Sequence, residues 1–136
     1  MSDDADVREV LERFRSGWET LDAEAVLSCF EPSDATTVVG TDATEYWRGY
    51  EGFAGPFRAM TDAFTAPRYA WAMAPRVEVV GEIAWADGVL DTTLVTESGE
   101  VRAELRSTWV LRRRPEGWKV VQAHFSVAPD TPVAEY

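Results

Sequence analysis

The spacing of apolar residues changes near Pro67, and this change constrains the fold more than any other feature of the sequence. Before Pro67, apolar residues recur every three or four positions, which is the period of a helix with one buried face. After Pro67, apolar and polar residues tend to alternate, which is the period of a strand with one buried face. Helices followed by long strands predict an α+β domain, with the helices packed on one face of an antiparallel sheet.

Three helices are expected in the first half of the chain. Asp6 and Glu9 approximate a capping box for the first helix. Asp22 can cap the second helix. Pro56 is expected in the first turn of the third helix, where proline is tolerated. The predicted ranges are 7–21, 23–30 and about 53–64.

Strands are expected on both sides of the third helix. A short, β-branched strand is predicted at 34–40, followed by a loop at 41–49. In the second half, Gly81-Glu82 suits a two-residue type II′ hairpin turn, and Ser98-Gly99 and Pro115-Glu116 suit two further tight turns. The later strands are predicted at 68–73, 76–80, 83–96, 101–113 and 118–127.

The length and charge of the chain limit its class. We expect a single domain over residues 1–136, with a core at about 6–128 and a loose tail at 129–136. The 13 basic and 24 acidic residues give a net charge of −11, which repels nucleic acid and anionic lipid. No apolar run approaches the ~20 residues of a membrane-spanning helix, and the acidic N-terminus is unlike a secretory signal. We therefore expect a cytoplasmic protein that binds neither nucleic acid nor membrane.

Metal and cofactor sites are not expected. Cys29 is the single cysteine, which excludes an internal disulfide and a cysteine-cluster metal site. His124 is the single histidine, and the carboxylates form no recognisable calcium loop. The chain also has no glycine-rich phosphate loop and no serine nucleophile elbow. We expect Cys29 to be an inert thiol in the core.

The face on which His124 lies depends on the strand register. If Pro115-Glu116 is a two-residue loop, His124 lies opposite Ser107, and Gln122 lies opposite Trp109. Polar groups then converge around His124 on an otherwise apolar sheet face, which is typical of a small-molecule pocket. A one-residue slip would move His124 to the opposite face. The inferred pocket face holds Ala86, Gly88, Leu90, Thr92, Leu105, Ser107, Trp109, Leu111, Val120, Gln122, His124 and Ser126.

The opposite face of the sheet has too much apolar surface for a fully solvated face. It also carries an expected cross-strand ion pair between Asp91 and Arg106, which contributes little if it is exposed. An exposed apolar patch indicates a partner, most simply a second copy of the chain packed sheet to sheet. The residues expected in this homodimer interface are Trp85, Val89, Val110, Val121 and Phe125.

Over nearly all of residues 6–128 the chain resembles the nuclear transport factor 2-like superfamily, and most closely its SnoaL-like branch. The resemblance implies a cone-shaped, cystatin-like roll, in which three helices pack on a strongly curved, mostly antiparallel sheet. It also implies a pocket in the wide end of the cone, and dimers are common in such proteins. The segments that carry the resemblance are VREVLERFRSGWETLDAEAVLSCF, DATTVVG, EYWRG and RSTWVLRRRPEGWKVVQAHFS.

The chain departs from the catalytic patterns of the better-known enzymes that it resembles. In the steroid-isomerase-like pattern a carboxylate follows the first strand, where this chain has Val38 and Val39. The cyclase-like pattern requires an Asp, or an Asp–His pair, on the cavity strands, whereas the inferred pocket face has His124 and no carboxylate. The paired acids and the arginine of epoxide hydrolysis are not identifiable. The fold itself does not decide the function, because it hosts many chemistries.

Each candidate site residue has a functional and a structural interpretation. His124 is a catalytic base or ligand anchor, because histidine suits proton transfer near neutral pH, or it is a buried imidazole that holds the last strand in place. Trp109 is the aromatic residue expected to contact a ligand. Trp47 and Tyr46 either form the pocket wall or fill the cone. The polar residues expected to line the ligand site are Gln122, Ser107 and Ser126.

Asp42 and Glu45 are the best remaining acids, because their loop leads toward the expected pocket mouth. Their spacing also fits a local capping turn, which is the preferred interpretation.

Two hypotheses for the function remain open. The first is a binding pocket for a small, largely apolar molecule. As an enzyme, such a protein would be a cofactor-free isomerase, dehydratase or cyclase that uses His124 as its base. The second is a non-catalytic dimeric binding or structural module with a filled cone. A void of roughly a few hundred Å3 favours the first hypothesis, and packing by Trp47, Trp109 and Phe57 favours the second.

Overall fold

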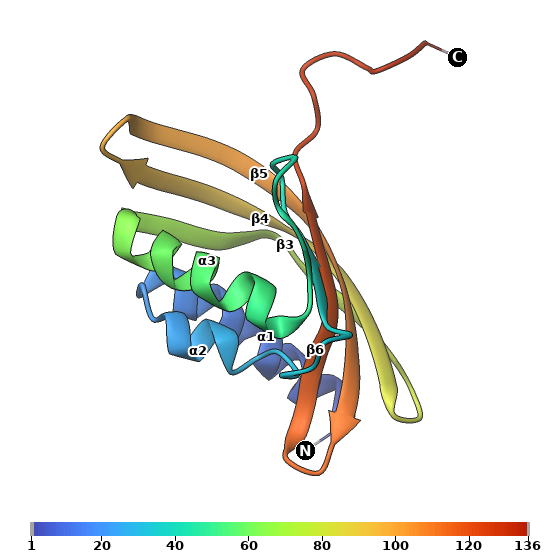
Figure 1. The fold of residues 1–136 in the computed structure, drawn as a ribbon. Coiled ribbons are helices and arrows are strands. Elements are labelled where there is room, and N and C mark those ends of the chain that lie inside the picture. The colour runs from blue at the N-terminus through green and yellow to red at the C-terminus, as the bar shows by residue number, and fades with distance from the viewer. Residues whose placement is uncertain (1, 136) are drawn as a thin grey trace.

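Over residues 2–135, the fold combines three helices with one curved six-stranded sheet. A computed structural model describes residues 2–135 of the chain. Figure 1 shows all three helices on the same, concave face of the sheet. The predicted α+β class is therefore confirmed. The helices are α1 (Asp3–Glu19), α2 (Ala23–Leu27) and α3 (Tyr50–Ala63).

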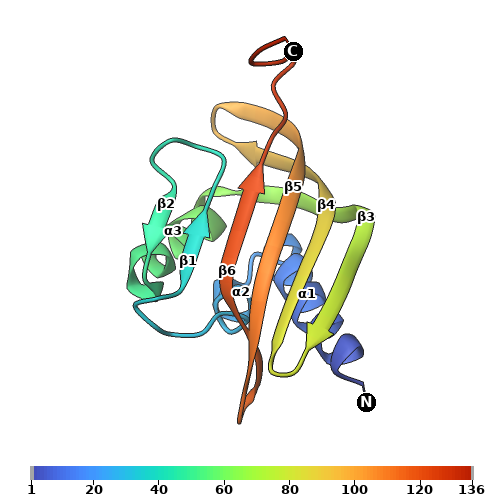
Figure 2. The same ribbon diagram turned by 90° about the vertical axis from the view of Figure 1, so that its right-hand side faces the viewer.

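The strands lie in the order β2-β1-β6-β5-β4-β3, as Figure 2 shows from the other face of the sheet. Each neighbouring pair is antiparallel except β1 and β6, which are parallel. The sheet is therefore mixed but mostly antiparallel. Its strands are β1 (Thr37–Val39), β2 (Tyr46–Arg48), β3 (Thr65–Val80), β4 (Ile83–Thr96), β5 (Gly99–Arg114) and β6 (Gly117–Ser126).

The helix starts differ in part from those predicted. The predicted capping box at Asp6 is wrong, because α1 begins earlier and its N-cap is Ser2, whose Oγ accepts from the N–H of Ala5 at 3.2 Å. Asp22 caps α2 as predicted. Pro56 lies inside α3, since that helix begins at Tyr50 rather than near residue 53. The predicted loop at 41–49 contains strand β2.

Phe14 of α1 joins the helices to the sheet. Its ring centroid lies 4.7 Å from that of Trp109 on β5 and 5.6 Å from that of Phe125 on β6. The ring of Phe14 also packs edge to face against the rings of Trp18 and Phe30, with centroid distances of 6.3 Å and 6.1 Å. Aromatic pairs contribute about 0.5–1.5 kcal/mol each beyond the area that they bury. This aromatic cluster therefore fixes the position of α1 on the inner face of the sheet.

Side chains of α1 also hold the backbone of β3 at Tyr69. The guanidinium of Arg15 donates to the carbonyl of Tyr69 at 2.6 Å, and the Glu19 carboxylate accepts from the N–H of Tyr69 at 3.1 Å. Arg15 is kept in place by ion pairs with Glu19 at 3.3 Å and with Glu12 at 2.7 Å. Charge-assisted hydrogen bonds of this kind are among the stronger ones in proteins. The position of Tyr69 is therefore set by the first helix as well as by the sheet.

The tight turns follow the prediction closely. Val80 pairs with Ile83, so Gly81-Glu82 is a two-residue turn, and the positive φ of 62° at Gly81 alone fits type II′. Arg114 pairs with Gly117, so Pro115-Glu116 is also a two-residue loop. The remaining turn is Glu97-Ser98, one position earlier than predicted, because Thr96 pairs with Gly99. That error shifts the pairing by two residues and leaves every side chain of β4 and β5 on its predicted face.

A β-bulge at Val121 changes the facing of β6. Pairing follows the predicted register from the turn to Leu111, which lies opposite Val120. The next pair is Val110 with Gln122, so Val121 is an extra residue on β6. Beyond it, the inward side chains are the buried Ala123 and Phe125 instead of the predicted ones. The predicted inward facing of Gln122, His124 and Ser126 is therefore wrong.

The outer face of the sheet also differs in detail from the prediction. Asp91 lies opposite Glu104 and not opposite Arg106, so the predicted ion pair is wrong. Trp85 is 47% exposed and lies beside Val110 on this face, while Val89 is half-buried on the same strand. Of the residues predicted for a dimer interface, Val121 is the half-buried bulge residue and Phe125 is in the core.

Two glycines in helices test the closeness of the helix packing. A Cβ at Gly17 would lie 2.7 Å from Cγ2 of Val26 on α2, whereas a Cβ at Gly52 of α3 would lie 3.7 Å from its nearest neighbour, Cβ of Trp47. Gly17→Ala should therefore lower the free energy of unfolding by about 1–3 kcal/mol through overpacking. Gly52→Ala should raise it by about 0.5–1 kcal/mol, because alanine favours the helix. Urea unfolding measures both, and a stabilising Gly17→Ala would contradict the close contact of α1 with α2.

Candidate functional site

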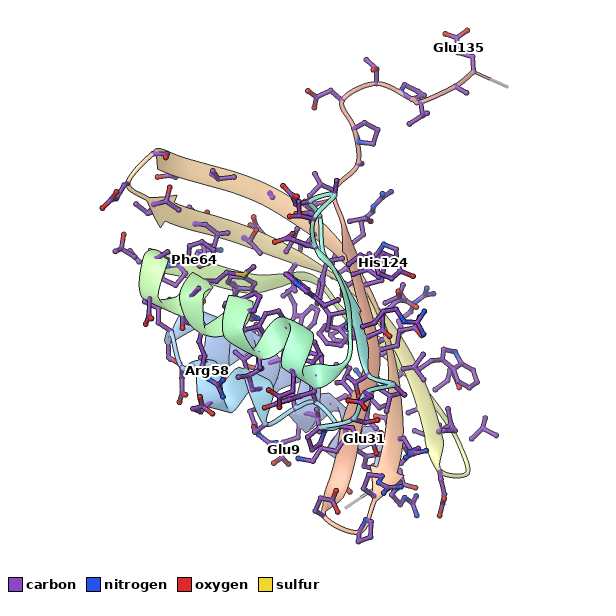
Figure 3. The ribbon with its side chains drawn as sticks, in the orientation of Figure 1. Glu9, Glu31, Arg58, Phe64, His124 and Glu135 are labelled. Carbon is purple, nitrogen blue, oxygen red and sulfur yellow. The ribbon has the colours of Figure 1, made fainter. Side chains whose placement is uncertain are left out.

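A cavity of about 410 Å3 lies between α1, α3 and the concave face of the sheet. Its wall includes Phe14, whose ring is part of the aromatic cluster, and Phe64, which directly follows α3 (Figure 3). Most of the other lining side chains are aromatic or aliphatic. The main ones are Trp18, Trp47, Phe57, Met60, Leu105 and Phe125.

Few polar side chains line this cavity. Thr92 is occupied, because its Oγ1 donates to the carbonyl of Ala103 at 2.8 Å. Arg102 is largely exposed and forms an ion pair with Glu100 at 2.9 Å. Thr41 is exposed. The half-buried Glu45 and the buried Tyr69 are the two remaining polar side chains of the lining.

Glu45 lies in the connection between β1 and β2. Its Oε1 accepts from the N–H of Asp42 at 3.0 Å, which fixes the carboxylate against its own loop. Gly40 makes room for this arrangement, because a Cβ at that position would lie only 2.6 Å from Oε1 of Glu45. The local sequence therefore places a carboxylate at the cavity wall and holds it there.

Asp42 takes a structural place in the same loop. Its Oδ1 accepts from both the N–H and the hydroxyl of Thr44, each at 2.8 Å. Both hydrogen bonds lower the pKa of the Asp42 carboxyl, and the one from the backbone N–H of Thr44 has the larger effect. The capping-turn interpretation thus holds for Asp42, while Glu45 both closes the turn and lines the cavity.

Tyr69 presents a hydroxyl group to the cavity. The residue is 7% exposed, and its hydroxyl makes no hydrogen bond with any of residues 2–135. No fully buried side-chain oxygen or nitrogen in that range lacks a partner, so this hydroxyl is accessible from the cavity. Burial, and to a smaller extent the charge of Glu45, raises the pKa of Tyr69 well above that of a free tyrosine. The group is therefore a hydrogen-bond donor at neutral pH.

The polar residues predicted from the last strand do not reach the cavity. His124 is exposed and lies on the sheet face that points away from the helices (Figure 3). It pairs with Thr108 and Val39 on that face. Gln122 is exposed as well, and Ser126 accepts a hydrogen bond from Arg106 at 3.0 Å. The predicted base and two of the predicted ligand-binding residues are thus not available to a molecule in the cavity.

The other predicted site residues divide into core, wall and surface. Trp109 is 2% exposed, and its Nε1 donates to Oγ of Ser107 at 3.0 Å. Ser107 in turn donates to the carbonyl of Gly88 at 2.8 Å, so both residues belong to the core below the cavity. Trp47 lines the cavity, which corresponds to the first of its two interpretations. Tyr46, its neighbour on β2, is 64% exposed and points to the other side of the sheet.

Tyr69 was not among the predicted site residues, although the predicted pairing of β3 with β4 already indicated its inward facing. Continuing the pairing from the Gly81-Glu82 turn would place Tyr69 opposite Leu94, on the inner face of the sheet. Irregularities of β3 near Met73 move its partner to Thr92, which lies on the same face. The inward position of this tyrosine could therefore have been read from the sequence.

The other sites considered from the sequence do not add a functional group. Cys29 is fully buried, and burial raises the pKa of its thiol to about 11, as expected for an inert core residue. Within residues 2–135, no three His, Cys, Asp or Glu side chains cluster in a way that could hold a metal ion. In the same range, no helix is both long enough and apolar enough to cross a membrane.

Comparison with known families and structures places this arrangement among proteins of the same shape. A family model described as a SnoaL-like domain matches residues 7–130. Comparison with curated proteins finds no match. The chain is similar to an NTF2-like superfamily protein from Salmonella enterica serovar Typhimurium LT2, with 21% identity, a TM-score of 0.86, and coverage of 98% of this chain and 96% of that chain.

Two further solved structures have the same architecture. One is a proposed dehydratase of the NTF2-like family from Streptomyces avermitilis, with 19% identity, a TM-score of 0.82, and coverage of 93% of this chain and 96% of that chain. The other is a protein with a cystatin-like fold from Caulobacter vibrioides, with 18% identity, a TM-score of 0.78, and coverage of 93% of this chain and 89% of that chain. At these identities the likeness shows the fold, and it confirms the expected cystatin-like roll.

Ser107 and His124 provide a matched test of the observed strand facing. Ser107→Ala leaves the indole N–H of Trp109 buried without an acceptor, so it should lower the free energy of unfolding by about 1–3 kcal/mol. His124→Ala removes an exposed side chain and should change that free energy by no more than about 0.5 kcal/mol. Urea unfolding distinguishes the two, and a large loss of stability in His124→Ala would contradict the outward facing of the last strand.

Proposed function

This chain belongs to the SnoaL-like domain family, and on that premise we propose that it binds a small, largely apolar molecule in the cone. The observation that carries the proposal is the cavity of about 410 Å3 with its apolar wall. Ligand sites in proteins have volumes of roughly 300–1,000 Å3 and carry few polar groups on a hydrophobic lining. The cavity agrees with both features.

The alternative of a filled cone has less support. Trp47 and Phe57 contact each other edge to face at 5.9 Å on the cavity wall, and they leave the space beside them open. Trp109 packs against Phe14 and Phe125 in the core instead of filling the cavity. The three aromatic residues that could have filled the cone thus support the binding hypothesis.

Proton-transfer chemistry of the isomerase, dehydratase or cyclase type is a further part of the proposal. The similarity to a proposed dehydratase supports it. Glu45 takes the role of base that the sequence assigned to His124, because it is the one carboxylate that lines the cavity within residues 2–135. A carboxylate held at an apolar wall is a common form of general base.

The homodimer expected from the sequence remains a proposal, and its position is the outer face of the sheet. Exposed apolar side chains there support it, among them Trp85 at 47%, Met73 at 50% and Ile83 at 41% exposure. Exposed apolar side chains that gather on one face commonly mark a contact with another protein. Phe125 no longer belongs to the proposed interface, because it is in the core.

Filling the cavity should weaken binding without unfolding the protein. Leu105→Trp adds an indole to the cavity wall, and Thr108→Trp adds the same group to the outer face of the same strand. The fluorescence of N-phenyl-1-naphthylamine, a neutral apolar dye, measures binding. We expect at least about a tenfold weaker affinity for Leu105→Trp and no change for Thr108→Trp. Equal binding by both variants, each shown to be folded by urea unfolding, would contradict the proposed site.

Trp85 tests the proposed homodimer. Light scattering after size-exclusion chromatography should give a mass of about 30 kDa for the protein, twice the 15.2 kDa of one chain. Trp85→Glu places a charge in the interface and should give the mass of one chain. Val133→Glu changes a 95% exposed residue of the C-terminal tail and should leave the dimer intact. A monomeric wild-type protein would contradict the proposal.

A further inference from the structure

Two polar groups reach the apolar cavity from separate parts of the fold. Tyr69 comes from β3, whose backbone is held at this residue by Arg15 and Glu19 of α1. Glu45 comes from the loop between β1 and β2, at the far edge of the sheet order. Neither group depends on the other for its position. An apolar wall with a few separately fixed polar groups is how pockets orient a ligand.

Tyr69 offers a hydrogen-bond donor and keeps its proton. Its hydroxyl is accessible from the cavity and has no partner among residues 2–135. Its ring is stacked on that of Trp18, with centroids 6.1 Å apart and planes at 15°. The ring and its backbone are therefore fixed before any ligand arrives, which reduces the entropy lost on binding.

Glu45 offers a hydrogen-bond acceptor. Its Oε1 accepts from the N–H of Asp42, and no group among residues 2–135 donates to its second oxygen, which is left for a ligand. An ionised carboxylate accepts hydrogen bonds and donates none. Its side chain packs directly over Gly40, which limits the ways in which it can move.

A hydroxyl group matches this pair, because it accepts one hydrogen bond and donates another. A carboxylate on the ligand would meet the negative charge of Glu45, and Arg102, a cation in the cavity lining, is already paired with Glu100. A carbonyl group would satisfy Tyr69 and leave Glu45 without a donor. A neutral hydroxyl group is the one of these three that pairs with both residues.

We propose that Tyr69 and Glu45 together recognise the hydroxyl group of a neutral, ring-containing ligand, with Tyr69 donating to its oxygen and Glu45 accepting its proton. The ring is inferred from the wall, where the aromatic side chains of Trp18, Trp47 and Phe57 offer both faces and edges to a flat molecule. The inference rests on the proposed function, since it names the class of molecule that the cavity takes.

Three naphthalenes of similar shape separate the two contacts. 2-Naphthol can accept and donate a hydrogen bond, 2-methoxynaphthalene can only accept one, and 2-methylnaphthalene can do neither. Displacement of N-phenyl-1-naphthylamine gives the affinity of each. We expect 2-naphthol to bind about tenfold tighter than 2-methoxynaphthalene, and the latter about tenfold tighter than 2-methylnaphthalene, because each step adds one hydrogen bond.

Two variants test which residue causes each of the two differences in affinity. Tyr69→Phe removes only the hydroxyl, so it should abolish the preference for 2-methoxynaphthalene over 2-methylnaphthalene. Glu45→Gln keeps an oxygen for the N–H of Asp42 and turns an amide nitrogen, a donor, toward the ligand. It should therefore abolish the preference for 2-naphthol over 2-methoxynaphthalene. Neither variant should weaken the binding of 2-methylnaphthalene.

The outcomes distinguish this inference from the proposed function. If all three naphthalenes bind the wild-type protein equally, the hydroxyl recognition is wrong while a binding cavity remains. If the preferences exist but survive in Tyr69→Phe and Glu45→Gln, the assignment to these two residues is wrong. If neither the dye nor any of the naphthalenes binds, the proposed function fails together with the inference.

Discussion

The extra residue at Val121 determines which side chains face the interior of this protein. A strand without it would turn His124 and Gln122 toward the helices, where the aromatic cluster offers few hydrogen-bond partners, and burying them there would be costly. With the bulge, Phe125 faces inward and stacks on Phe14 at 5.6 Å, with planes at 7°. The bulge thus makes the inner face of β6 apolar.

The same bulge affects the neighbouring strand and the loop beyond it. β1 pairs in parallel with the part of β6 that follows Val121, and Val38 lies beside Ala123. Both of these residues are buried, so β1 presents its apolar side to the interior as well. The loop after β1 then carries Glu45 to the cavity wall. The position of the carboxylate therefore depends on a backbone irregularity on another strand.

The support of the cavity is divided between the two ends of the sheet. At the β3 end, Arg15 and Glu19 of α1, which form an ion pair with each other, make hydrogen bonds with the backbone of Tyr69. At the β1 end, Gly40 and a backbone N–H hold Glu45. The aromatic residues between them are fixed mainly by contacts with one another. An apolar chamber with two separately anchored polar groups suits a ligand that is mostly ring with one polar substituent.

Much of the fold could be predicted from the sequence because it depends on local patterns. The hydrophobic stripe of α1, the Asp22 cap and the Gly81-Glu82 turn are each encoded within a few residues. The facing of β4 and β5 was correct even though one turn was misplaced, since a shift of two residues preserves the face. The family resemblance added the cone shape, which the comparisons confirm.

The site was harder to predict because it depends on single-residue shifts. Val120 and Val121 are two adjacent valines in an otherwise alternating strand, which is a trace of the bulge, but a regular strand accommodates the same pair. A shift of one residue was enough to exchange His124 for Phe125 as the inward side chain. Tyr69 is different, because the regular pairing and the irregular pairing of β3 both place it on the inner face, so its facing could have been read from the sequence. The bulge on β6 has no unambiguous local signal, so the facing of the residues that follow it could not be read from the sequence.

The most direct test of the account is to observe where an apolar ring molecule touches the protein. Intermolecular nuclear Overhauser effects from 2-methylnaphthalene to the methyl groups of the isotope-labelled protein give this information. We expect contacts to Leu105 and Leu94 on the cavity wall and none to Val110 or Val39 on the outer face, while the single imidazole signal of His124 stays unchanged. Contacts to the outer-face valines together with a shifted His124 signal would contradict both the strand facing and the site.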